Sequence, residues 1–264
     1  MTKRVLMCPP DYFDVIYAIN PWMDTSVKVN VEEAKKEWSC LVEIYKGLNI
    51  QVELLPAQKN LPDMVFSANG SFAIGDTALI SSYRYKERQP EAQFHRSWFK
   101  EHGFDIQETD GITYEGEGDS LLVGQNILQG WGFRSDQEIK NVLIAVFPDY
   151  QVQMLHLIDE RFYHLDTCLF PVNSKLIFYY KPAFDSASIK LLNRIFTNAI
   201  AVTDKEALSF GLNSIIVGEN VVLPAHAVKF AERIKSHGFH VIKAKMGEFG
   251  KSGGAVKCVT NEIW

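Results

Sequence analysis

The chain has 264 residues, of which 47% are hydrophobic and 22% are charged, and its formal net charge is −5. This is ordinary globular composition, and a chain of this length can bury a stable core without disulfides or metal ions. A mildly acidic chain without a basic cluster is not typical of nucleic-acid-binding proteins. The longest uninterrupted apolar run, residues 142–147, is too short for a transmembrane helix, so we expect no membrane partner.

The N-terminal residues and the cysteines indicate a cytoplasmic protein. The first apolar run ends at Pro9-Pro10 and is too short for a signal peptide. The cysteines are scattered without a CxxC pair, so we expect reduced thiols at all of them: Cys8, Cys40, Cys168 and Cys258. No segment has the composition of a linker, and we predict a single domain over residues 1–264.

In chain order, the first predicted elements are a strand at residues 4–8, a helix at 31–47 and a strand at 51–55. Four hairpins then follow, each with two short strands around a polar turn. They cover residues 71–81, 120–130, 169–179 and 214–224. Their turn residues lie 49, 49 and 45 residues apart and are Gly75, Gly124, Asn173 and Gly218. Gly and Asn supply the positive φ of tight hairpin turns, so we expect such a turn in each hairpin.

An amphipathic helix and a further strand follow each hairpin. The helices are predicted at residues 90–102, 135–145, 186–196 and 226–237. The strands are predicted at residues 104–107, 151–156, 199–202 and 239–243. The chain therefore repeats a unit of two strands, a helix and a strand four times.

The two ends of the chain supply the material for a fifth unit. We expect a strand at residues 255–259, which would complete the N-terminal strand, helix and strand. A unit split across the termini indicates a closed ring rather than an open solenoid with polar caps. We therefore predict an α/β fold, a five-bladed α/β propeller of ββαβ units with pseudo-fivefold symmetry, closed by both termini. The alternative is a doubly wound α/β sheet, against which the repeated hairpins argue.

The repeat also predicts where reactive side chains meet. Glu115 and His164 each lie nine residues before a hairpin turn residue, so in a ring they would face the same place. Asp63 and Asn69 lie in the corresponding segment before the first hairpin, and Cys258 belongs to the split unit. A cysteine, a histidine and acidic or amide residues would then converge from separate units, as nucleophilic catalysis requires.

Several motifs carry a family resemblance over essentially the whole chain. They are INPWM (19–23), LPDMVFSAN (61–69), RYKERQPE (84–91), EGEGD (115–119), HLDT (164–167) and SGGAVKC (252–258). In this order they resemble the guanidino-group-modifying (pentein) superfamily, which includes arginine deiminases, arginine dihydrolases, dimethylarginine dimethylaminohydrolases and amidinotransferases. The resemblance implies the same five-bladed propeller and a small guanidino substrate, arginine or a methylarginine.

The resemblance also implies roles for the catalytic residues. Cys258 would attack the guanidino carbon as a thiolate, His164 would act as general acid and base, and Glu115 would orient His164. Because EGEGD has one residue more than the usual acid-Gly-Gly-Asp, Glu117 is an alternative to Glu115. We prefer Glu115, whose offset from the hairpin turn matches that of His164.

The remaining candidate residues would bind the substrate. The resemblance implies that Asp166 holds the guanidinium, that Arg88 and Arg134 hold the α-carboxylate, and that Asp63 meets the α-ammonium. Asn69 stands where many relatives that act on free arginine or methylarginine carry Asp; the dihydrolase type has Asn, which favours arginine turnover.

This chemistry needs no metal or organic cofactor, and His164 with Cys168 alone is poor zinc spacing. The sequence therefore favours a hydrolase. The alternatives are an amidinotransferase, for which no acceptor site is visible, and a non-enzymatic arginine sensor, which would not need a nucleophile. The sequence leaves open whether the chain forms a homo-oligomer.

Overall fold

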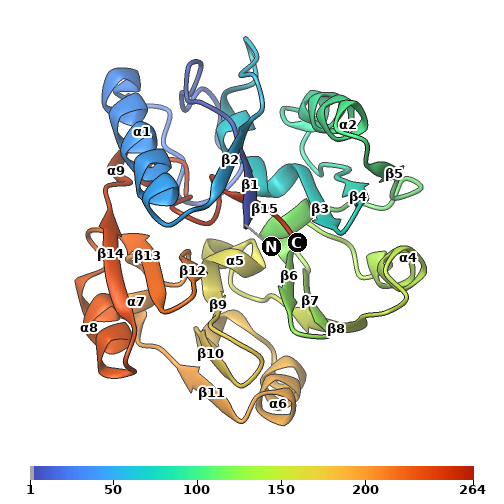
Figure 1. The fold of residues 1–264 in the computed structure, drawn as a ribbon, viewed down its shortest axis with the longest axis vertical. Helices are drawn as coiled ribbons and strands as arrows, with labels where there is room; N and C mark the ends of the chain where they lie inside the picture. Colours follow the sequence, from blue (N-terminus) through green and yellow to red (C-terminus); the bar gives the residue numbers. More distant parts are fainter. Residues whose placement is uncertain (1–2) are drawn as a thin grey trace.

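The computed structural model describes residues 3–264, which form a mixed α/β fold with several small sheets (Figure 1). The strands are β1 (Arg4–Met7), β2 (Gln51–Leu54), β3 (Ser71–Ile74), β4 (Thr77–Ile80), β5 (Asp105–Gln107), β6 (Ser120–Val123), β7 (Asn126–Trp131), β8 (Gln151–His156), β9 (Leu169–Pro171), β10 (Leu176–Tyr179), β11 (Asn198–Ala201), β12 (Ile215–Val217), β13 (Asn220–Pro224), β14 (His240–Ala244) and β15 (Asn261–Ile263). The α-helices are α1 (Val31–Gly47), α2 (Ala92–Glu101), α3 (Gly116–Asp119), α4 (Ile139–Val146), α5 (Leu165–Cys168), α6 (Ser186–Ile195), α7 (Asp204–Ala207), α8 (Val228–Ser236) and α9 (Gly247–Gly250).

The predicted repeat of hairpin, helix and strand is present. In one unit β6 and β7 pair antiparallel, α4 follows, and β8 returns parallel to β7. The same order recurs in β3-β4-α2-β5, in β9-β10-α6-β11 and in β12-β13-α8-β14. The helix is needed because the third strand can run parallel to the second only after a crossover.

The two ends of the chain share one sheet, as predicted. β15 pairs antiparallel with β1, and β2 pairs parallel with β1 after α1. β15 also contacts β3 through Ile263 and Ala73, so these strands join β3-β4-β5 in a six-stranded sheet. In Figure 1 the sheets surround a common centre, the long helices lie outside them, and β1 and β15 lie near the middle.

Three of the four predicted hairpin turns have the expected backbone. Gly75, Gly124 and Gly218 have φ of 63°, 59° and 59°. The prediction for Asn173 is wrong, because this residue is not among those with positive φ. Its side-chain oxygen instead accepts the N–H of Lys175 at 2.9 Å and of Leu176 at 3.0 Å, and this Asx-type turn replaces the left-handed residue.

The strand predicted at residues 255–259 is also wrong, since the C-terminal strand is β15 at Asn261–Ile263. Residues 255–259 form turns, in which Val259 N–H donates to Ala255 O at 3.3 Å and Thr260 N–H to Lys257 O at 2.9 Å. These backbone donors are therefore taken locally and are not available to a sheet ladder.

The core lies between the sheets and the outer helices. On α8, for example, Phe230 and Ile234 are fully buried, and Phe230 packs edge-on against Phe178 of β10. Each buried side chain of this size contributes about 1.5–3 kcal/mol of transfer free energy. Within residues 3–264, no helix is both long enough and apolar enough to span a bilayer. This packing fixes the inner ends of the sheets, where the candidate site residues lie.

Candidate active site

Glu115 and His164 meet at the centre of the molecule. Each immediately precedes a short helix, α3 or α5, that leads into the first strand of a hairpin. His164 Nε2 lies 2.8 Å from Glu115 Oε2, and both side chains are buried. Equivalent positions in consecutive units thus bring the imidazole and the carboxylate into direct contact.

Glu117 lies in a different environment from Glu115, although only Gly116 separates the two residues. Gly116 has φ of 53°, and a Cβ there would lie 2.7 Å from the backbone of Ser71. This left-handed glycine turns the chain, so that Glu117 accepts hydrogen bonds from Lys257 Nζ and Trp264 Nε1, both at 2.7 Å. The structure therefore places Glu115, not Glu117, beside His164.

Burial and neighbouring charges together set the protonation states of this pair. Burial lowers the pKa of His164 to about 4, although Glu115 opposes the change, so the ring is neutral at pH 7. Burial alone would raise the pKa of Glu115, but Arg134 and His164 hold it well below its usual value. Because the ionised carboxylate accepts from His164 Nε2–H, the ring's Nδ1 is left to accept a proton.

Cys258 is 3% exposed and lies beside Asp166. Its thiol donates to Asp166 Oδ2 at 3.3 Å, and its sulfur accepts Asn213 Nδ2–H at 3.1 Å. Burial, together with the negative charge of Asp166, raises the pKa of Cys258 well above its usual value. Cys258 is therefore expected to carry a neutral thiol in the free protein.

Asp166 has one oxygen without a partner. Its Oδ1 is buried and accepts no hydrogen bond within residues 3–264. Burial raises the pKa of Asp166 to about 7, although the charge of Lys257 opposes the change. A buried carboxylate with an unpaired oxygen is suited to bind a cationic hydrogen-bond donor.

A small hollow opens onto Cys258. It is lined by four of the predicted substrate-binding residues, by the loop at 19–23 and by neighbours of Cys258: Ile19, Asn20, Met23, Asp63, Phe66, Asn69, Arg88, Arg134, Tyr163, Ser252 and Cys258. Glu115 contacts Arg134 of this lining, His164 contacts Glu115, and Asp166 contacts Cys258. All the predicted site residues are thus brought together at one place.

The two arginines differ in how many donors remain for a ligand. Arg88 directs four of its five N–H groups to Glu91, Asn69 Oδ1 and the carbonyl of Asp63. Arg134 directs two, one to Glu115 Oε2 at 2.9 Å and one to Ile19 O at 3.0 Å. Arg134 therefore keeps more capacity to bind a carboxylate.

Asp63 and Asn69 are both buried in the wall of the hollow. Asp63 accepts the hydroxyl of Tyr17 at 2.9 Å and that of Ser252 at 3.3 Å, and burial raises its pKa although Arg88 opposes the change. Asn69 Nδ2 has no hydrogen-bond partner within residues 3–264. Both residues therefore retain polar atoms that a ligand can use.

The loop at residues 19–23 covers the hollow. Asn20 Nδ2 donates to Tyr163 Oη at 3.2 Å and to Ser252 O at 3.0 Å, and Trp22 Nε1 donates to Arg161 O at 2.7 Å. Trp22 also packs against Phe210, with ring centroids 4.7 Å apart. These contacts hold the loop over Cys258.

The sequence prediction missed Asn213, which contacts Cys258. The available signal was its place in the segment before the fourth hairpin, since the corresponding segments supply Asn69, Glu115 and His164. Asn213 was overlooked because it carries no charge and no nucleophile.

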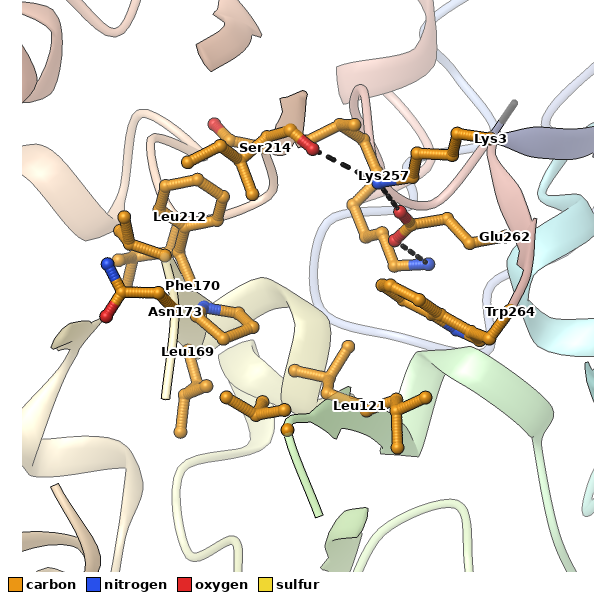
Figure 2. Close-up of a pocket in the computed structure, with 17 residues that line it drawn as sticks. Lys3, Leu121, Leu169, Phe170, Asn173, Leu212, Ser214, Lys257, Glu262 and Trp264 are labelled. Atoms are coloured by element: carbon orange, nitrogen blue, oxygen red, sulfur yellow. Dashed lines mark hydrogen bonds and ion pairs between the residues drawn. The ribbon is translucent and has the colours of Figure 1, made fainter. Parts of the chain in front are cut away.

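A larger hollow of about 680 Å³ lies elsewhere and contains none of the predicted site residues. Figure 2 shows its apolar wall, with Leu121, Leu169 and Phe170, opposite a charged wall. In the charged wall, Lys257 pairs with Glu262 at 3.3 Å, and Lys3 also pairs with Glu262. Lys257 also pairs with Glu117, so the two lysines face two carboxylates, and the described residues that line this hollow include no cysteine or histidine. Among residues 3–264, no group of three His, Cys, Asp or Glu side chains is placed to hold a metal ion.

A buried thiol, an imidazole–carboxylate pair and a second carboxylate around one hollow define a class of enzyme, the cysteine-dependent hydrolases that act on guanidino groups. The model of the family described as N,N dimethylarginine dimethylhydrolase, eukaryotic, matches residues 14–264. The chain belongs to this dimethylarginine dimethylaminohydrolase family.

Relatives of two kinds are similar to the chain. The N(G),N(G)-dimethylarginine dimethylaminohydrolase of Mycobacterium tuberculosis is 42% identical, over 99% of this chain and 86% of that protein. The bifunctional arginine dihydrolase/ornithine cyclodeaminase ArgZ of Synechocystis is 38% identical, but the chain spans 37% of its length. The N-terminal domain of ArgZ, solved bound to product, superposes with a TM-score of 0.95 at 35% identity, covering 100% of this chain and 98% of that one.

Proposed function

We propose that this protein hydrolyses a C–N bond in the guanidino group of arginine or an Nω-methylated arginine. The products would be citrulline with ammonia or a methylamine, or, after a second hydrolysis that releases another ammonia and the guanidino carbon as carbon dioxide, ornithine. The single observation that carries the proposal is the arrangement at one small hollow: Cys258 lines it and contacts Asp166, and the His164–Glu115 pair contacts Arg134 of the same lining. Relatives named for dimethylarginine hydrolysis and for arginine dihydrolysis support the same substrate class.

Substrate binding activates the nucleophile. A guanidinium that enters the hollow reaches Cys258 and the unpaired Oδ1 of Asp166 behind it. Its positive charge offsets the burial and the negative charge that keep Cys258 protonated. Ionisation is therefore favoured when the substrate is present, and the free thiol stays unreactive.

The bond changes occur in two halves. In the first, the thiol sulfur bonds to the guanidino carbon, the C–N bond breaks, and the thiol proton leaves with the amine through His164. In the second, water adds to the carbon of the thiouronium intermediate, His164 accepts a water proton, and the C–S bond breaks. The thiol is regenerated and the product is a ureido group. Glu115 holds the imidazole through Nε2–H during both halves.

The amino-acid end of the substrate meets opposite charges. Arg134, with three donors left, is suited to the α-carboxylate, and Arg88 contributes the positive potential of a buried guanidinium. Asp63 would accept the α-ammonium. The two ends together select a free amino acid over a bare guanidine.

Asn69 supports arginine as the first substrate to test. Its amide is neutral, its Oδ1 accepts Arg88 Nη1–H at 2.7 Å, and its Nδ2 remains unpaired. A neutral donor at this point can bind the carbonyl oxygen of a ureido group or water, whereas a guanidinium nitrogen offers it no acceptor. A site that can also hold the ureido product suits an enzyme that hydrolyses it further, releases a second ammonia with carbon dioxide, and forms ornithine.

We also propose that the repeated units form a five-bladed α/β propeller that makes up one domain over residues 1–264. β1 pairs antiparallel with β15 and parallel with β2, which repeats the strand order of the other units and supports this ring. A cytoplasmic location is supported by the four cysteines of the described chain, all of which carry free thiols.

Product analysis tests the function. Arginine, monomethylarginine, asymmetric dimethylarginine and agmatine would each be incubated with wild type and with Cys258→Ser, and the products measured by mass spectrometry. We expect ornithine or citrulline with ammonia from arginine, and no product with Cys258→Ser. Turnover by Cys258→Ser equal to wild type, or no turnover of any substrate, would contradict the proposal; tight arginine binding without turnover would favour a sensor.

A further inference from the structure

Asn213 joins the segment after α7 to the turn that carries Cys258. Its side chain is fully buried. Oδ1 accepts three backbone N–H groups, those of Ala255 at 3.1 Å, Lys257 at 3.0 Å and Cys258 at 3.2 Å. Nδ2 donates to Cys258 Sγ and to the carbonyl oxygen of Asp166, both at 3.1 Å. One amide thus contacts both the nucleophile and its neighbouring carboxylate residue.

These contacts fix the geometry of the turn. Three N–H groups directed at one oxygen wrap residues 255–258 around the amide, so Cys258 cannot move independently of Asn213. The two Nδ2 contacts then set the position of Cys258 relative to Asp166. Only an amide side chain of this length supplies both the acceptor and the two donors; Asp lacks the donors, and Gln is longer.

We propose that Asn213 is the positioning residue of the nucleophile: it holds Cys258 against Asp166 and stabilises the thiolate by donating Nδ2–H to the sulfur. A hydrogen bond to an ion is stronger than one to a neutral group, so this contact strengthens when the thiol ionises. It therefore favours the reactive form without touching the substrate. The inference rests on the proposed function of the site, in which Cys258 is the nucleophile.

Asn213→Asp is the sharpest test, because it preserves shape while exchanging a donor for an acceptor. One oxygen of Asp still accepts the three N–H groups, and the other faces Cys258 Sγ and the Asp166 carbonyl without a proton to donate. Asn193→Asp is the matched control, since Asn193 is exposed on α6 and the substitution adds the same formal charge. Thermal unfolding would show that both variants are folded.

The readouts separate a positioning role from a purely structural one. The rate of Cys258 alkylation by iodoacetamide would be measured against pH without substrate, and kcat and KM would be measured with arginine. In Asn213→Asp we expect the alkylation profile to move up by at least about one pH unit and kcat to fall about 100-fold, with KM within about threefold. The control should match wild type in both.

A folded Asn213→Asp with an unchanged alkylation profile and unchanged kcat would overturn the inference. If this variant does not fold, Asn213→Ser serves in its place, with the same expected directions and the same contradicting result. The alkylation experiment needs no substrate, so its outcome is readable even if no guanidino compound is turned over. Failure of the proposed function and failure of this inference are therefore distinguishable.

Discussion

Glu115 and Glu117 are two residues apart, yet they belong to two different buried charge clusters. Glu115 contacts His164 and Arg134 beside the hollow that reaches Cys258. Glu117 contacts Lys257, which also pairs with Glu262. Both carboxylates are essentially inaccessible to solvent. Burial and charge therefore do not distinguish the reactive cluster from the structural one.

The difference lies in what each cluster leaves unpaired. Around Glu115, the buried atoms Asp166 Oδ1 and Asn69 Nδ2 have no partner in residues 3–264. Around Glu117, each charged group meets an opposite charge: Lys257 pairs with Glu117 and Glu262, and Lys3 pairs with Glu262. Buried polar groups without partners are costly, and beside a hollow a bound ligand can supply the missing partner. The first cluster is arranged for a ligand and the second for stability.

Removing the nucleophile should have the largest effect. Cys258→Ser is expected to lower kcat with arginine by at least about 1,000-fold, because a serine hydroxyl in this buried place is far less readily ionised than a thiol. Little change in melting temperature is expected. Cys40→Ser, at an exposed cysteine, is the control and should retain full activity. Activity of Cys258→Ser near that of the control would show that Cys258 is not the nucleophile.

The paired variants Glu115→Gln and Glu117→Gln test the comparison directly. Glu115→Gln should lower kcat by about 100-fold or more, because the imidazole loses its ionised acceptor. Glu117→Gln should retain kcat within about tenfold but lose about 3 kcal/mol of unfolding free energy, because Lys257 loses a buried partner. Steady-state kinetics and urea unfolding measure both. If Glu117→Gln lowered kcat and Glu115→Gln only lowered stability, Glu117 would be the catalytic partner and Glu115 the structural one.

The pH dependence of kcat/KM should report Asp166. Burial raises the pKa of Asp166 to about 7, although Lys257 opposes the change. Below this pH the free carboxyl is protonated and cannot hold a guanidinium, so kcat/KM should fall up to tenfold per pH unit as the solution becomes more acidic.

Glu117 also has a pKa raised to about 7 by burial, so it must be separated from Asp166 in this experiment. The profile would be measured from pH 5 to 9 with arginine, for wild type and for Glu117→Gln. We expect kcat/KM to fall below about pH 7 in both proteins. If kcat/KM stayed constant down to pH 5 in wild type, or no longer fell at acid pH in Glu117→Gln, the fall could not be assigned to Asp166.

The covering loop should give the smallest effect. Trp22→Ala removes the hydrogen bond to Arg161 O and the packing against Phe210, so the loop at 19–23 is held less firmly over the hollow. We expect KM for arginine to rise about three- to tenfold with kcat within about twofold. An unchanged KM would mean that the loop does not take part in substrate binding.

The sequence by itself determined the repeated units and the meeting of Glu115 with His164. Hairpins, helices and strands are encoded in local periodicity and turn residues, and equal offsets within a repeat place residues at equal positions in space. For this reason α1 at Val31–Gly47 and β8 at Gln151–His156 agree with the predicted bounds. The expectation of a positive φ at the turn residue was wrong at Asn173. There the side-chain oxygen accepts two backbone N–H groups and stabilises the turn without a left-handed residue.

The tertiary structure alone decided the finer features of the site. Residues 255–259 have the composition of a strand, but Asn213, distant in sequence, binds their N–H groups and keeps them in a turn. The choice between Glu115 and Glu117 depended on Gly116, whose left-handed backbone fits closely against Ser71. Both outcomes result from contacts between segments far apart in the chain, which local periodicity does not record, and these contacts determine which buried atoms remain available to a substrate.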